Sequence, residues 1–331
     1  MVRPWPGLLV ATVVGCAIPV IAPAAAQQAT NERGSAPFAP LPEAPEVDAA
    51  KAELGRLLFF DERLAGDTGN SCATCHDPAK GWGDGQALSD GYSGVLYFRN
   101  APGLFNVAAR RHLMWDGRLD GSDLATAVRD MITEAHTMNM DTRLAQERLK
   151  QVPEYVAMFE AAFGPGDPYG GKIYGAIAEF LKTIRTANAP FDRHLRGEAN
   201  ALAEEQKHGM ELFTGKAGCV ACHAGPLLSD GRAHVTGVPE HPEIGADPER
   251  QITMLRHFAT MGTPNYMNMR TDVGEYAVSK DETDIGRFAP LPCGTLARPA
   301  PTCIAACSRR SPRWSSSTTR AAARRRTRAP R

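Results

Sequence analysis

The sequence has no hydrophobic run long enough to cross a membrane. Its most apolar stretch, residues 8–21, is interrupted by Gly15 and Pro19 and is shorter than the roughly 20 residues that a membrane-spanning helix requires. The chain also lacks alternating apolar and polar segments of any length, the pattern of half-buried strands. These absences exclude a spanning helix at the N-terminus and a fold built on sheets, and they favour a mostly α chain.

The N-terminus has instead the organisation of a secretory signal peptide over residues 1–26. Arg3 supplies the positive charge, residues 8–21 form the apolar part, and three alanines at 24–26 offer a cleavage site before Gln27. Cys16, preceded by Val-Val-Gly, leaves lipoprotein processing open as an alternative. We therefore predict export to the periplasm.

Acidic residues are absent after Phe288. The formal net charge of 0 combines 37 acidic residues, all within residues 27–288, with 37 basic residues, ten of which are arginines after Phe288. Residues 27–288 carry 37 acidic against 26 basic residues, a net charge of −11. Such a charge can steer a basic partner such as a small electron-donor protein, or it can serve solubility alone. Nothing in this body predicts nucleic-acid binding.

The most informative residues form two Cys-x-x-Cys-His pentads, at 72–76 and 219–223. This is the attachment signature of c-type haem, in which the cysteines bond the haem and the histidine reaches the iron. The expected cofactor ligands are Cys72, Cys75, His76, Cys219, Cys222 and His223. One alternative is a zinc site from all four cysteines, which does not explain a histidine after both pairs. The other is two disulfides, but a bridge across two residues is usually catalytic and no thioredoxin-like pattern surrounds either pair.

The pentads belong to an internal repeat. A Gly-x-x-Leu-Phe segment at 55–59 precedes the first pentad and another at 209–213 precedes the second. An Asp-Gly turn follows each pentad. We predict tandem cytochrome c-like domains with long loops and few or no strands, the first over residues 27–187 and the second over 188–288.

Apolar spacing between the pentads predicts a series of helices. One is capped by Ser122, and another begins at Pro153 and ends at Gly164. The remaining expected helices cover residues 143–150, 173–184 and 201–213.

Beyond the pentads, longer strings resemble the bacterial di-haem cytochrome c peroxidase family, which includes the MauG-like enzymes. They are LGRLLFFDERLAG, SCATCHDPAKGWGDG, RNAPGLFNVA, MWDGR, IAEFLKTIRTANAPFDRHLRG and LFTGKAGCVACHAGPLLSDGRAH, spread over about residues 50–290. The resemblance implies two haem domains with a calcium ion between them. One haem would be the peroxide site and the other would relay electrons.

Individual residues take roles from this resemblance. His76 and His223 match the proximal iron ligands of the first and second haem. Asn100 matches a calcium ligand, and an amide carbonyl suits that ion; a turn residue before Pro102 is the plainer interpretation. Trp115 matches a tryptophan that carries electrons between the haems; a packed core aromatic is its alternative.

Two departures from the family pattern concern the first haem. The region 88–93 has no histidine, whereas many family members place one there to cap the iron. We expect an open first haem, with His136 a better candidate to reach it than His112. Thr137 stands where the family has an acid/base glutamate. Glu134 and His136 are therefore the expected proton carriers, and the departure adds weight to a MauG-like activity.

Residues 289–331 change composition abruptly, to arginine, serine, alanine and proline. Taken literally they form a disordered basic tail. A reading-frame shift near Ala289 explains them better, because a neighbouring frame permits family-like sequence. Cys293, Cys303 and Cys307 then have no chemical role. The hidden frame would carry further calcium ligands and the second haem's distal ligand, so we expect impaired activity for the chain ending at Arg331.

The sequence thus predicts a periplasmic di-haem peroxidase that reduces hydrogen peroxide with electrons from a cytochrome c or cupredoxin. One alternative is MauG-like oxidation of a side chain in a partner protein. Another is an electron carrier without peroxide chemistry, which an open first haem disfavours. The resemblance also implies a homodimer as one assembly state.

Overall fold

The computed structural model describes residues 37–92, 94–186 and 188–289 of the 331-residue chain. The predicted signal peptide lies outside these residues, and so does the predicted aberrant tail apart from Ala289. Helices and connecting loops dominate, and the one sheet of the described residues has two strands, β1 (His112–Leu113) and β2 (Leu119–Asp120), paired antiparallel. Within the same ranges, none of the helices has the length and apolar character needed to traverse a lipid bilayer.

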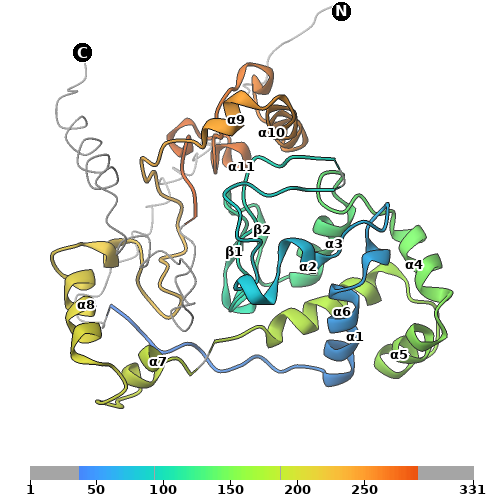
Figure 1. Cartoon of the computed structure of the whole chain (residues 1–331), viewed down its shortest axis with the longest axis horizontal. Coiled ribbons are helices and arrows are strands. Elements are labelled where there is room, and N and C mark those ends of the chain that lie inside the picture. Colours follow the sequence, from blue (N-terminus) through green and yellow to red (C-terminus); the bar gives the residue numbers. More distant parts are fainter. Residues whose placement is uncertain (1–36, 93, 187, 290–331) are drawn as a thin grey trace, which may run out of the picture. The chain divides into compact units, whose positions relative to one another are not determined.

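Six helices belong to the half of the chain that carries the first pentad (Figure 1). They are α1 (Ala49–Phe59), α2 (Cys72–Cys75), α3 (Leu124–Thr133), α4 (Thr142–Lys150), α5 (Pro153–Phe163) and α6 (Gly170–Thr183). The predicted start at Pro153 and stop at Gly164 are confirmed. The predicted cap at Ser122 is wrong: α3 is capped by Asp123, whose carboxylate accepts from the Thr126 amide at 3.0 Å. A carboxylate is well suited to this position.

Five further α-helices follow in the described residues. They are α7 (Pro190–Leu195), α8 (Glu204–Thr214), α9 (Pro242–Ala246), α10 (Pro248–Thr260) and α11 (Tyr276–Ser279). The helix expected over residues 201–213 begins at Glu204, because the chain before it forms a turn.

The principal core surrounds the pairing of α1 with α6 and also takes in α3 and α5. Gly55 makes the α1–α6 approach close: a Cβ atom there would lie 1.9 Å from the carbonyl oxygen of Ala176. A larger residue would push the two helices apart. Burial of the surrounding Leu54, Leu58 and Ile177 side chains stabilises the pairing by roughly 1.5–3 kcal/mol each.

Two smaller apolar clusters complete the packing. One gathers residues of α9, α10 and α11 around Leu88 and Phe98, which precede the Trp-Asp-Gly-Arg string. The other places Phe38 and Leu228 against side chains of α7, α8 and the second pentad. The domain boundary near residue 188 stays a prediction.

Candidate haem sites

The two pentads adopt related local structures. The first forms the single turn α2, in which the His76 amide donates to the Cys72 carbonyl at 3.0 Å. The second forms a 3₁₀ turn over Cys219–Ala221, and the His223 amide donates to the Cys219 carbonyl, also at 3.0 Å. Because cysteines three apart on a helical turn share a face, each turn presents both sulfurs together with the following histidine.

Both pentad histidines are oriented by a backbone carbonyl. Nδ1 of His76 lies 3.0 Å from the Trp82 oxygen, and Nδ1 of His223 lies 3.0 Å from the Leu228 oxygen. Trp82 and Leu228 have φ angles of 62° and 53°, an unusual conformation for bulky residues. A carbonyl accepts only from a protonated Nδ1, which leaves the Nε2 lone pair for a metal. Burial lowers the pKa of His76 and favours the neutral ring that ligation needs.

The alternatives to haem attachment find no support. No disulfide joins any of the four pentad cysteines. Over the described ranges there is no group of three or more His, Cys, Asp or Glu residues that could hold a metal ion. Burial raises the pKa of Cys72 to about 12 and that of Cys75 to about 11, so both thiols are protonated when no group is bound.

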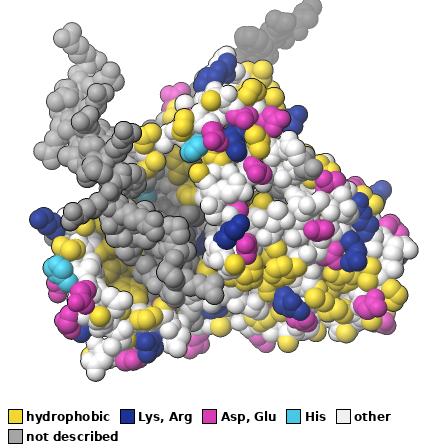
Figure 2. All heavy atoms as spheres, viewed as in Figure 1, with side chains coloured by type: hydrophobic (Ala, Val, Ile, Leu, Met, Phe, Trp, Pro, Cys, Tyr) yellow, Lys and Arg dark blue, Asp and Glu magenta, His cyan; other side chains and the backbone are white. Residues whose placement is uncertain are grey.

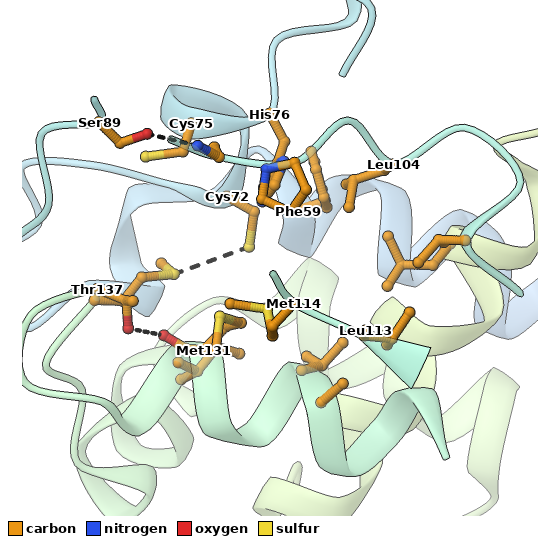
Figure 3. A pocket seen from close by; sticks show the side chains of 18 of the residues that line it. Phe59, Cys72, Cys75, His76, Ser89, Leu104, Leu113, Met114, Met131 and Thr137 are labelled. Carbon is orange, nitrogen blue, oxygen red and sulfur yellow. Dashed lines mark hydrogen bonds between the residues drawn. The ribbon is translucent and has the colours of Figure 1, made fainter. Parts of the chain in front are cut away.

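A cavity opens beside the first pentad (Figure 3). The empty space between its lining residues, open mouth included, is about 1240 Å³. In Figure 3, Cys72 and His76 lie on one side, and Met131 and Thr137 of the α3 region lie on the other. Most of the lining is aliphatic, aromatic or thioether, as a flat apolar macrocycle needs.

Arg110 gives a second test of whether haem fits this cavity. The side chain lines the cavity, and one of its amino groups donates to the carbonyls of Gly103 and Phe105 at 2.7 and 2.8 Å. Its Nε is buried without a hydrogen-bond partner, and burial lowers the pKa of Arg110 to about 10. A buried guanidinium without an anion is costly, and a carboxylate of haem would supply the missing partner. The residues present therefore fit haem.

The structure brings the two predicted proton carriers together. His136 is buried and lines the cavity, whereas Glu134 lies behind it, with its Oε2 2.6 Å from His136 Nε2. The two atoms are at ion-pair distance without the alignment of a hydrogen bond. Burial alone would raise the pKa of Glu134, but its contact with His136 and the charge of Arg118 lower it. Glu134 is thus held as a carboxylate.

The other candidates near the cavity are placed differently. The Thr137 hydroxyl donates to the carbonyls of Met131 and Glu134, so it terminates α3 and has no proton to offer a ligand. His112 is exposed on β1 and does not line the cavity. Tyr97, which sequence reasoning missed, stacks on His136 with ring centroids 4.9 Å apart. Its position next to the Arg-Asn string was the available signal.

Trp115 and Asn100 are directly connected. The indole Nε1 of Trp115 donates to the Asn100 main-chain oxygen at 3.0 Å, and both residues are half-buried. Asn100 also lines the first cavity. This hydrogen bond fixes the indole next to the cavity wall. The position is compatible with an electron-relay role for Trp115 and equally with a packing role.

A buried charge cluster, also missed from the sequence, surrounds the residue after Trp115. Asp116 accepts from Arg99 at 2.6 Å and from Arg118 at 3.1 Å, and His257 of α10 completes the set. Arg99 also forms a bidentate pair with Asp272 at 2.6 and 2.8 Å. Buried charges need such pairing. Asp116 and Arg118 belong to the Trp-Asp-Gly-Arg string. No sequence motif around His257 or Asp272 indicated that they would join this cluster.

The second pentad lies in a smaller apolar setting. The ring of Phe213 on α8 is 6.2 Å from that of His223. His234 pairs with Asp230 at 2.9 Å in the turn that follows the pentad. The repeat therefore places an apolar helix residue and a polar turn at this second candidate haem site.

Comparison with known proteins agrees with this geometry. Residues 49–200 match the model of the di-haem cytochrome c peroxidase family. A cytochrome-c peroxidase, IdrP2, of Denitromonas iodatirespirans is 59% identical over 256 residues, covering 77% of this chain and 70% of the relative. The chain belongs to the di-haem cytochrome c peroxidase family. The predicted family and oxidoreductase class are thereby confirmed.

Other members of the di-haem peroxidase family are more distant. The methylamine utilization protein MauG of Methylorubrum extorquens is 38% identical, covering 70% of this chain and 66% of that protein. The crystal structure of a MauG-like protein associated with microbial copper homeostasis matches with a TM-score of 0.63 at 25% identity, covering 78% of this chain and 74% of that one. The di-haem peroxidase BthA of Burkholderia thailandensis E264 shares the fold, with a TM-score of 0.60 at 20% identity, covering 77% and 68%. The mostly helical fold is confirmed, and membership of the family implies covalently bound haem c.

Proposed function

We propose that this protein is an exported di-haem peroxidase that reduces hydrogen peroxide with electrons from a small redox protein. The overall reaction consumes one peroxide, two electrons and two protons and yields two waters. The observation that carries the proposal is one cavity lined both by a pentad histidine with an available Nε2 and by the buried His136, which is paired with Glu134 behind it. Bound haem supplies the iron redox chemistry that cleaves the peroxide bond.

The chain's own residues handle the protons. His136 reaches the cavity and takes the place of the family glutamate as the group that accepts a proton from peroxide and returns it. Glu134 stays ionised beside it and stabilises the charged imidazole ring. The apolar lining excludes water and strengthens this pair, because the local dielectric is low.

Cys219, Cys222 and His223 would hold the second haem, which would supply electron relay, and we assign the indole of Trp115 to the path between the two sites. The hydrogen bond from Trp115 to Asn100 keeps the indole in one orientation. The partner is a small cytochrome c or cupredoxin. On the face shown in Figure 2 acidic and basic side chains are interspersed. The net charge of −11 of residues 27–288 therefore attracts a basic partner to this face as a whole and not to one acidic patch on it.

MauG-like oxidation of a partner protein is the second candidate. It is favoured by Thr137, whose hydroxyl is bonded to carbonyls and cannot replace the family glutamate. Kinetics with the purified protein distinguish the two candidate functions. A peroxidase turns over rapidly with reduced cytochrome c, whereas a protein-oxidising enzyme turns over slowly and leaves an oxidised residue in its partner. A carrier without peroxide chemistry would show neither.

We keep calcium, the periplasm and a homodimer as parts of the proposal. Asn100 is the calcium candidate; its main-chain oxygen already accepts from Trp115, so its side-chain oxygen is the available ligand. Intact mass of protein isolated from its host tests export and attachment together. A mass above that of residues 27–331 plus two haems, fitting the neighbouring frame, is expected. The mass of residues 27–331 plus two haems would mean that the written tail is real, and a mass without haem would contradict the proposal.

Turnover of the chain ending at Arg331 provides the functional test. We expect slow peroxide consumption by this chain, and faster consumption when the neighbouring frame is restored after residue 288. A Cys72→Ser/Cys75→Ser double variant should carry one haem and lose the activity. Retention of full activity in this variant would exclude the first pentad as the peroxide site.

A further inference from the structure

Helix α10 has three buried polar side chains that the proposed reaction does not use. Arg250, Thr253 and His257 are 7%, 2% and 1% exposed and share one side of the helix, because residues spaced by three and four positions do so. Met254 and Phe258 beside them are fully buried in an apolar cluster. Buried polar groups require partners, and apart from Glu243 and the Arg250 carbonyl these partners come from residues 89–116.

Arg250 and Thr253 bind two short chain segments, residues 88–91 and 95–99, which we call the wall arms. The Arg250 guanidinium donates to the carbonyl of Ser89 at 3.2 Å and to that of Tyr97. The Thr253 hydroxyl donates to the Leu96 carbonyl at 2.9 Å. The two side chains therefore hold both arms at once, although more than 150 residues separate Arg250 from either arm.

The wall arms form part of the first haem cavity. Ser89, Asp90, Gly91 and Tyr97 line it. The arms are joined to each other by few bonds, among them Tyr97 amide to Ser89 carbonyl at 3.0 Å and Gly91 amide to Val95 carbonyl at 2.7 Å. A two-stranded pair this short is marginally stable by itself. The position of the two wall arms therefore depends on the residues that pack against their outer side.

Arg250 suits that task for a specific reason. Its charged donors bond carbonyls more strongly than neutral donors do, and its charge is balanced by Asp90 at 3.7 Å and Glu243 at 3.5 Å. Asp90 belongs to an arm and also lines the cavity, so the same guanidinium contacts an arm through backbone and side chain. Lysine has no planar fork with which to make these contacts together.

We infer that Arg250 is a positioning residue for the first haem cavity: by bonding both wall arms from outside, it sets how readily a small ligand reaches the iron site above His76. This inference rests on the proposed function, because it needs haem at the first pentad. The second pentad's half of the chain thereby controls access to the first.

Amide hydrogen exchange of the full-length haem-loaded protein tests the hold on the arms. Arg250→Met removes bonds that involve a charged donor, so exchange at the Tyr97 and Gly91 amides should rise about tenfold or more. Thr253→Val should give a smaller rise. Arg256→Met, an exposed position on the same helix, should leave exchange unchanged. A rise spread evenly over the chain would show general destabilisation and overturn the inference.

Cyanide binding to the ferric protein tests the functional part. A loosened wall should raise the association rate at the first haem about threefold or more in Arg250→Met, with unchanged haem content and an intermediate value in Arg250→Lys. Equal rates in Arg250→Met and the wild type would overturn the inference while leaving the proposed peroxidase intact. Wild-type protein without haem absorbance would instead overturn the proposed function, and the same exchange comparison on the haem-free full-length protein would then test the arms.

Discussion

His257 on α10 lies 3.0 Å from Asp116, nitrogen Nε2 to oxygen Oδ2, and the two side chains are 1% and 0% exposed. Burial lowers the pKa of His257, and the charges of Arg99 and Arg118 act in the same direction, against the hydrogen bond to Asp116. Burial alone would raise the pKa of the Asp116 carboxyl, but His257 and the two arginines outweigh it and hold that pKa low. The pair is therefore a neutral imidazole donating to a carboxylate, next to Trp115.

This pair predicts a pH dependence of stability. Below about pH 6.5 the unfolded chain binds a proton at His257, whereas the folded chain, in which the pKa of His257 is lower, does not. The free energy of unfolding therefore falls as the pH falls towards that lowered pKa, by at most about 1.4 kcal/mol per pH unit. His257→Gln removes this contribution. Thermal unfolding from pH 8 to pH 5.5 should show a shallower decline for the variant, and parallel curves for both proteins would contradict the assignment.

His136 should dominate the proton chemistry. His136→Gln keeps a polar side chain but loses the imidazole that accepts and returns a proton. The rate of the peroxide reaction should therefore fall by a factor of about 10²–10⁴, with haem content unchanged. Glu134→Gln should show a smaller loss. His112→Gln, exposed on β1, is the matched control. Stopped-flow mixing with peroxide measures the rate, and a His136→Gln rate within threefold of the wild type would remove this residue from the mechanism.

Trp115 should affect electron delivery more than folding. Trp115→Phe loses one hydrogen bond to Asn100, worth about 0.5–1.5 kcal/mol, and replaces an oxidisable indole. Steady-state turnover with reduced cytochrome c should fall about tenfold or more, a change of about 1.4 kcal/mol in the barrier. Trp82→Phe is the control, since it keeps the backbone carbonyl that bonds His76. Equal turnover of the two variants would favour a packing role for Trp115.

Gly55 and Gly209 occupy the same place in the internal repeat, yet their surroundings differ. A Cβ at Gly55 would meet the Ala176 carbonyl oxygen at 1.9 Å, whereas nothing lies within 4 Å of one at Gly209. Gly55→Ala should therefore lower the free energy of unfolding by about 1–3 kcal/mol. Gly209→Ala should stabilise, because alanine is favoured over glycine in a helix by up to about 1 kcal/mol. Denaturant unfolding of both variants measures the difference, and a stabilised Gly55→Ala protein would contradict the close helix contact.

The sequence by itself determined the features whose chemistry is local. Each haem pentad is complete within five residues, so its attachment role can be read without a fold, and the helices follow from apolar spacing and from stops such as Gly164. The family resemblance depended on strings of the same kind. The cap at Ser122 was mispredicted because neighbouring serine and aspartate both suit such a position, and only backbone geometry selects Asp123.

Tertiary structure decided the contacts between distant parts of the chain. His257 and Asp116 are 141 positions apart, and Arg250 and Ser89 are 161 apart. No periodicity or motif encodes such pairs, because each depends on how α10 packs against a loop. The same holds for the carbonyls of Trp82 and Leu228, which orient the two pentad histidines only because their backbones adopt positive φ. The pentad residues proposed to hold haem can be identified from the sequence alone, whereas the residues around them are brought together only by packing.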